Sequence, residues 1–197
     1  KGGSWYYKDS RLNVYAAIDF AYSLERQADW TALVVIGVDH DGHLYVLDID
    51  RFKSFKTIEY FKHIKLLHSK WNFKKLRTEV TAAQKTISEQ IKDYIKKDGL
   101  RLAVDEYRPS KQEGSKEERI AAMLEHRYDD MSVWHHEGGW TQVLEDELVA
   151  ARPKHDDIKD ALAAAVSIAV KPARSMTDRM EDFMSPQNRS RFGGFAA

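Results

Sequence analysis

Several residue patterns are missing from this sequence, and each absence excludes a class of protein. Cys does not occur, which excludes disulfide scaffolds and thiolate zinc sites. The 4 Pro and 10 Gly in 197 residues are too few for a collagen-like or low-complexity chain. The longest apolar-rich stretch, Ala161 to Val170, is shorter than a bilayer span. We therefore expect an ordinary globular, soluble protein without membrane contact.

Excess charge of one sign is also missing, because 31 Lys and Arg residues balance 31 Asp and Glu residues. Any argument for a polyanionic partner must rest on how the charge is distributed. Residues 53–77 carry eight basic residues, Lys62 and Lys65 among them, and a single Glu. This segment is either a phosphate-binding face, a solvated helix face or a dock for another domain. A second candidate for contact with a DNA backbone is a loop and helix start that holds Arg108, Lys111, Lys116 and Arg119.

The hydrophobic pattern predicts an α/β fold with a mixed sheet and helices on both faces. Apolar, β-branched segments at 13–20, 31–39 and 44–51 predict three antiparallel strands, and Asp41-Gly42 marks the second turn. Helical periodicity and shorter apolar runs then predict, in order, a helix at 56–71, a strand at 75–80, a helix at 83–97, a strand at 101–106, a helix at 116–127, a strand at 133–136 and helices at 141–151 and 155–170. The later strands should pair in parallel beside the first, which is then central. We expect one domain over residues 13–170, a lead-in at 1–12 and a polar tail at 171–197.

Carboxylates stand at the ends of three of these elements. Asp19 lies at the end of the first strand, and Glu79 ends the strand expected beside it. Asp156, Asp157 and Asp160 fall in the first turn of the last helix, where capping would explain one or two of them. Asp157 and Asp160 are three residues apart and so share a helix face. Small alanines after them would allow that face to lie close to the sheet.

Carboxylates from these three elements could converge around hard divalent cations. Mg²⁺ and Mn²⁺ prefer carboxylate oxygen, and two such ions stabilise the attacking and leaving oxygens of a phosphodiester displacement. The constellation therefore predicts a two-ion site for Mg²⁺ or Mn²⁺ and hydrolysis of nucleic acid.

Four motifs, taken with the order of elements, resemble the ribonuclease H-like superfamily, and more closely the nuclease domain of the large terminase subunit of tailed double-stranded DNA bacteriophages. The motifs are Ala-Ala-Ile-Asp19-Phe-Ala, Ala-Asp29-Trp-Thr-Ala-Leu-Val-Val, Arg-Thr-Glu79-Val and His155-Asp156-Asp157-Ile-Lys-Asp160-Ala-Leu-Ala. The resemblance implies a metal-dependent endodeoxyribonuclease with Asp19, Glu79 and Asp157 as the catalytic metal-binding triad. Asp160 would be the fourth carboxylate, and the choice between Asp156 and Asp157 as inner ligand stays open.

The same resemblance implies the biological setting. The substrate would be concatemeric viral double-stranded DNA, cut during genome packaging in the cytoplasm of the infected bacterial host. The partners would be the terminase ATPase domain, the small terminase subunit and the portal, and the isolated domain would be monomeric. No G-x-x-x-x-G-K-[ST] phosphate loop occurs, so we expect the ATPase motor to lie outside this chain.

Two other functions are consistent with the same residues. One is a junction resolvase or integrase-like nuclease of the same superfamily. The other is a non-catalytic module that docks DNA or the portal, in which the acidic residues are only caps and surface groups.

Overall fold

The computed structural model describes residues 4–20, 30–54, 56–81, 84–110, 113–150, 153 and 155–173. These residues form seven strands and five helices. The strands are β1 (Trp5–Tyr7), β2 (Ser10–Asp19), β3 (Thr31–Val38), β4 (Leu44–Phe52), β5 (Lys75–Glu79), β6 (Ala103–Tyr107) and β7 (Val133–His135). The helices are α1 (Thr57–Trp71), α2 (Lys85–Asp98), α3 (Lys116–Asp129), α4 (Thr141–Val149) and α5 (Asp157–Ser167). No helix among the described residues is long and apolar enough to cross a bilayer.

The sheet has the strand order β6-β5-β2-β3-β4-β7, and β1 pairs with β2 outside this path. β2, β3 and β4 pair antiparallel, whereas β5 pairs parallel with both β2 and β6, and β7 pairs parallel with β4. The predicted mixed sheet with an inner first strand is therefore confirmed. β1 adds an antiparallel strand within the segment that the sequence analysis treated as a lead-in.

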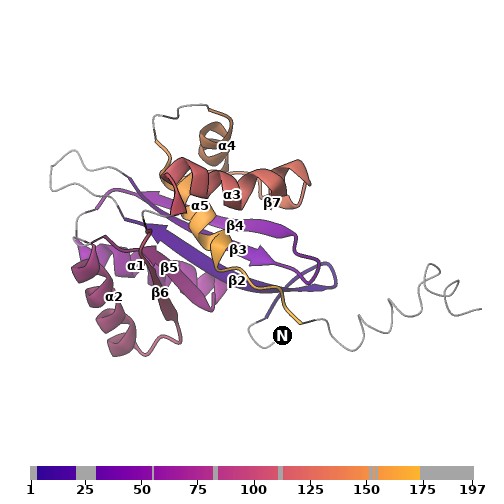
Figure 1. Ribbon diagram of the computed structural model, residues 1–197. Coiled ribbons are helices and arrows are strands. Elements are labelled where there is room, and N and C mark those ends of the chain that lie inside the picture. Colours follow the sequence, from indigo (N-terminus) through magenta and orange to yellow (C-terminus); the bar gives the residue numbers. More distant parts are fainter. Residues whose placement is uncertain are drawn as a thin grey trace, which may run out of the picture.

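Helices cover both faces of the sheet, as predicted (Figure 1). α1 and α2 pack on one face, where their buried residues Tyr60, Ile64 and Ile91 meet Leu33 and Val35 of β3. α3, α4 and α5 cover the other face. All eight residues of β3 are buried, as expected for an inner strand that is covered on both sides.

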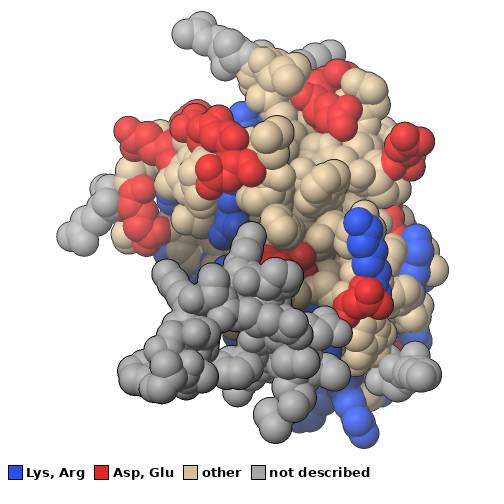
Figure 2. All heavy atoms as spheres, turned by 90° about the vertical axis from the view of Figure 1, so that its right-hand side faces the viewer, with Lys and Arg blue, Asp and Glu red and all other residues tan. Residues whose placement is uncertain are grey.

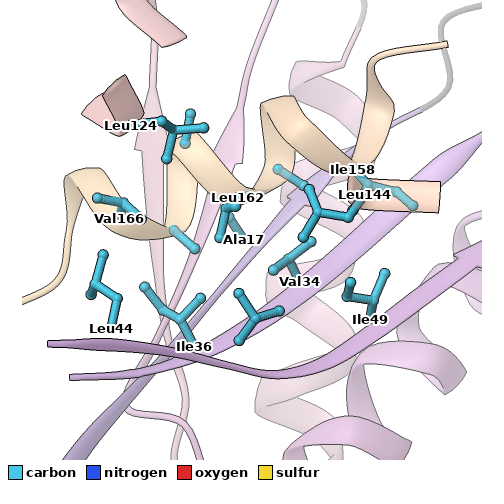
Figure 3. Packing of buried hydrophobic residues seen from close by; sticks show 14 of the residues in the cluster. Ala17, Val34, Ile36, Leu44, Ile49, Leu124, Leu144, Ile158, Leu162 and Val166 are labelled. Atoms are coloured by element: carbon cyan, nitrogen blue, oxygen red, sulfur yellow. The ribbon is translucent and has the colours of Figure 1, made fainter. Parts of the chain in front are cut away.

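α5 lies directly over the middle of the sheet. Figure 3 shows Ile158, Leu162 and Val166, spaced by one helical turn, directed from α5 toward Ala17 and Val34. Each of these five side chains is at most 4% exposed. Burial of a side chain of this size stabilises the fold by about 1.5–3 kcal/mol, so α5 is held firmly against β2 and β3.

Charge is unevenly distributed despite the zero net charge. Figure 2 looks at the right-hand end of the view in Figure 1, and acidic side chains gather in its upper part, at the level of α3 and α4. The carboxyl end of β2 points to the opposite end of the molecule (Figure 1). The acidic region in Figure 2 is therefore a different surface from the candidate site described next, and its charge disfavours contact with DNA phosphates.

Candidate active site

Strand alternation brings Asp19 and Glu79 to the same face of the sheet. Side chains alternate along a strand, and Ala17 of β2 belongs to the core beneath α5, so Asp19 two residues later faces α5. On β5 the side chain of Leu76 faces α1 and α2, which directs Glu79, three residues on, to the α5 face. β2 and β5 are adjacent and parallel, with Ile18 opposite Thr78. The two carboxylates therefore end neighbouring strands side by side.

α5 places its first turn above these two strand ends. Ala161 and Ala165 are completely buried, and their small side chains allow the helix to approach the sheet closely. Asp160 lies in the same first turn, and its side chain is 16% exposed. The helix thereby adds a third carboxylate to the region of Asp19 and Glu79.

These carboxylates lie close enough for their charges to shift one another's pKa, because β2 and β5 are adjacent and one helix, α3, contacts both Asp160 and Glu79. Burial raises the pKa of Asp19 well above its ordinary value, and the negative charges of Asp160, Asp157 and Glu79 raise it further. Burial and the charge of Asp160 likewise raise the pKa of Glu79. Burial also raises the pKa of Asp160, although the nearby Lys116 opposes this. The predicted acids from β2, β5 and α5 are thus brought together in one crowded, partly desolvated cluster.

Asp157 makes a different contact from Asp160. Its Oδ2 accepts a hydrogen bond of 3.0 Å from Nη2 of Arg51, which extends from β4 and is 8% exposed. The same guanidinium nitrogen lies 3.8 Å from Oε1 of Glu147, and the guanidinium stacks 4.8 Å from the ring centre of Trp30. Asp157 therefore contributes its charge to the cluster while one of its oxygens is held by a buried arginine.

Helix capping does not account for the aspartates of α5. Asp156 is the N-cap residue but makes no side-chain cap hydrogen bond. Glu147 of α4 does this instead, because its Oε2 accepts the backbone N–H groups of Ile158 at 3.1 Å and of Lys159 at 2.9 Å. Burial raises the pKa of Glu147 to about 7 despite these hydrogen bonds and the opposing charge of Arg51. The side-chain cap of α5 is therefore supplied by Glu147 and not by Asp156.

α3 brings two cations to the carboxylates. Nζ of Lys116 lies 2.9 Å from Oδ2 of Asp160 and 3.1 Å from Oδ2 of Asp156. One turn later, Nη2 of Arg119 lies 3.8 Å from Oε2 of Glu79. Both residues were predicted from the sequence to contact DNA, and the structure places them against the acidic cluster.

The other predicted DNA-binding residues lie elsewhere. Arg108 is exposed just after β6, and Lys111 lies outside the described residues. Lys62 and Lys65 belong to α1, which covers the face of the sheet opposite α5. Each is paired with a carboxylate, Lys62 with Glu59 at 2.8 Å and Lys65 with Asp98 at 2.7 Å. This pairing leaves less positive charge on α1 than the sequence suggests, and the DNA contacts of all these residues stay predictions.

Next to the cluster, a pocket of about 370 Å³ opens between α3, α5 and the strands β5 and β6. Its lining includes Glu79, Asp160, Lys116 and Arg119 together with apolar side chains such as Met123. Glu79 and Asp160 therefore border an accessible hollow and are not sealed in the core.

The chemistry of these donors suits a hard divalent cation, but their present positions do not. Asp19, Glu79 and Asp160 offer only carboxylate oxygens, the ligands that Mg²⁺ and Mn²⁺ favour, and a bound cation would oppose the burial and mutual repulsion that raise their pKa values. Among the described residues, however, no three Asp, Glu or His side chains stand close enough to hold one ion. Instead, the ammonium group of Lys116 lies between α3 and the carboxylates of α5.

Two residues of the site escaped the sequence analysis. Arg51 is two residues after Ile49 on the same strand, so the two side chains point to the same face of the sheet. Because Ile49 is an apolar core residue, this spacing was a signal that the charged side chain of Arg51 points inward. Glu147 follows Leu144 by three residues and so shares its buried helical face. Neither pattern identifies the residue with which the buried charge pairs, because the pairing residues are far apart in the sequence: Arg51 and Asp157 are separated by 106 residues.

The fold defined by this sheet and its helices is ribonuclease H-like. The chain is similar to the large terminase nuclease from thermophilic phage G20c, with a TM-score of 0.57, 17% identity and coverage of 85% of this chain and 89% of that one. The zinc-bound structure of the same nuclease gives a TM-score of 0.56 at 18% identity, with the same coverage. The fowlpox virus Holliday junction resolvase gives a TM-score of 0.50 at 15% identity, covering 78% of this chain and 95% of that one.

No protein-family model and no curated protein sequence matches the chain. At these low identities the likeness to solved structures establishes the fold alone.

Proposed function

We propose that this protein is a metal-dependent endonuclease that cuts double-stranded DNA, and that it acts as the nuclease part of a phage terminase large subunit. The observation that carries this proposal is the placement of Asp19 and Glu79 at the carboxyl ends of the adjacent strands β2 and β5, with Asp160 in the first turn of α5. The terminase nuclease that shares this fold over 85% of the chain supports the choice of substrate.

Asp19, Glu79 and Asp160 would hold Mg²⁺ or Mn²⁺ in this proposal. Asp157 would complete the donor set, because Arg51 fixes its orientation through Oδ2. The sequence resemblance implies Asp157 in the triad and Asp160 as the fourth carboxylate. The proposal takes the reverse order, because the buried Arg51 holds Oδ2 of Asp157. The bound ions would activate water and stabilise the leaving oxygen of a phosphodiester. A zinc-bound structure of the G20c nuclease supports the idea of a metal site in this fold.

The protein's own residues would prepare the site for this chemistry. Glu147 and Arg51 tie the start of α5 to α4 and β4, which fixes the height of Asp160 above the sheet. Arg119 and the exposed Arg108 would contact the DNA backbone beside the pocket. Contacts of this kind position a duplex without reading its sequence, which fits an enzyme that cuts with little sequence preference.

The proposal is tested by incubating supercoiled plasmid and linear duplex DNA with the protein in Mg²⁺, in Mn²⁺ and in EDTA. We expect cutting only with a metal, and its loss in Asp19→Asn. Asp98→Asn is the matched control, because Asp98 also pairs with a lysine but lies at the end of α2. A fully active Asp19→Asn variant, or a protein that does not cut in any metal, would refute the nuclease function.

A junction resolvase is the second candidate, favoured by the likeness to the fowlpox virus resolvase. A four-way junction cut in preference to a linear duplex of the same sequence would support it over the terminase function. A docking module without catalysis predicts cutting of neither substrate and no change of thermal stability with Mn²⁺.

A further inference from the structure

Lys116 stands at a helix position that ordinarily disfavours a cation. A capping box begins α3: Oγ of Ser115 accepts the N–H of Glu118 at 3.1 Å, and Oε2 of Glu118 accepts the N–H of Ser115 at 2.7 Å. This fixes Lys116 as the first residue of the helix. The positive end of the helix dipole lies there and repels a cation, so a favourable contact elsewhere must hold the side chain in place.

The carboxylates of α5 supply that contact. The ammonium group bridges Asp160 at 2.9 Å and Asp156 at 3.1 Å. Burial would lower the pKa of Lys116, but the charges of Asp160 and Asp19 outweigh it and raise the pKa above its ordinary value. The side chain is 37% exposed, and Lys116 lines the pocket together with Asp160 and Glu79.

We propose that Lys116 is a tethered cation that neutralises the carboxylate cluster in the metal-free protein, and that a divalent cation must displace it in order to bind. This inference rests on the proposed metal-dependent function. The side chain can leave without a change of fold, because a flexible stem of four methylene groups connects the ammonium group to the backbone. Metal binding then requires the ion pairs of Lys116 with Asp160 and Asp156 to break. The measured metal affinity is therefore lower than that of the same site without the lysine.

The effect of Lys116 on metal affinity follows from its charge. A unit positive charge about 6 Å from a divalent ion repels it. Even at the dielectric constant of water, this repulsion weakens the binding of the ion by about tenfold in Kd. Removal of the charge should therefore tighten Mn²⁺ binding by about tenfold or more. A residue that merely stabilises the fold would not tighten metal binding when it is removed.

The test is Mn²⁺ binding to the whole chain, followed by the electron paramagnetic resonance signal of free Mn²⁺. We expect Lys116→Gln to bind Mn²⁺ at least about tenfold more tightly than the unaltered protein. Lys116→Arg keeps the charge and should bind with nearly the original affinity. Lys92→Gln is the matched control, since Lys92 pairs with Glu106 at 2.7 Å on α2 and the edge strand β6.

Each outcome has a distinct meaning. An equal or weaker affinity of Lys116→Gln overturns the role of Lys116 and leaves the proposed function standing. A failure of every variant and of the unaltered protein to bind Mn²⁺ overturns both.

A second measurement applies if Lys116→Gln does not fold. An amine-acylating reagent, followed by mass spectrometry, should modify Lys116 of the unaltered protein several-fold more in Mn²⁺ than in EDTA, with Lys92 unchanged. Equal modification of Lys116 under both conditions overturns the proposal.

Discussion

Arg51 is the residue whose removal should most strongly disturb the start of α5. Its side chain is 6% exposed and faces two carboxylates, Asp157 at 3.0 Å and Glu147 at 3.8 Å, whose side chains are 13% and 4% exposed. Arg51→Met keeps much of the volume but leaves both acids buried without their cation. We expect this variant to be much less stable than the unaltered protein.

The expected loss can be estimated from the burial. Removal of one partner from a buried ion pair costs about 3–5 kcal/mol. Loss of the contact with the Trp30 ring adds about 0.5–2 kcal/mol. The two losses together amount to about 3.5–7 kcal/mol. A domain of this size loses about 2–4 °C of Tm for each kcal/mol, so a fall of roughly 7–28 °C is expected.

Urea and thermal denaturation in EDTA measure this loss. Lys65→Met is the matched control, because its ion pair with Asp98 is solvent-exposed and such pairs contribute about 0–1 kcal/mol. The further replacements Asp157→Asn and Glu147→Gln in Arg51→Met should recover part of the stability, since they remove the unpaired charges. A loss below about 1 kcal/mol in Arg51→Met would refute the assigned role of this network.

Three other outcomes follow from the same contacts. Asp160→Asn should lower the rate of DNA cutting by about 10³-fold or more, and Asp157→Asn should lower it by less. The opposite order in a plasmid assay would favour the assignment made from the sequence, in which Asp157 belongs to the triad and Asp160 is the fourth carboxylate. Glu147 has a folded-state pKa of about 7 against an ordinary 4.5, so its contribution to stability is present below about pH 4.5 and is lost as the pH rises through about 7. That loss amounts to about 3 kcal/mol, and Glu147→Gln should reduce the slope of unfolding free energy against pH over this range; an unchanged slope would contradict it. Mn²⁺ should raise the Tm of the unaltered protein and not that of Asp19→Asn. The reason is that the bound metal relieves the repulsion between the Asp19 carboxylate and its acidic neighbours. An equal rise of Tm in both proteins would place the metal elsewhere.

The sequence was sufficient for the fold because its patterns are local. Strand alternation in β2 and β3 and helical periodicity in α1 each specify an element within a few residues, and the Asp-Gly signal at residues 41 and 42 correctly placed the turn between β3 and β4. The helix predicted at 83–97 likewise ends within one residue of the observed end of α2, where Gly99 adopts a φ of 70°. Connection rules for parallel strands then limited the topology.

The site was only partly predictable, because its contacts join distant parts of the chain. Strand ends and helix starts predicted Asp19, Glu79, Asp157 and Asp160 as site residues, yet sequence alone could not decide whether Asp156 or Asp157 points inward. That difference depends on Arg51, which lies on β4, and on Lys116, which lies on α3. The same lysine looked like a DNA contact in the sequence, since a basic residue gives no local sign of the acid it pairs with.

We propose above all that carboxylates of β2, β5 and α5 form one site for a divalent cation. Crystals of the protein soaked in Mn²⁺ and measured at the manganese absorption edge test it most directly. We predict an anomalous peak in ligand contact with Asp19, Glu79 and Asp160, with the Lys116 side chain moved away. Manganese bound only at other positions, with Lys116 still paired to Asp160, would contradict it.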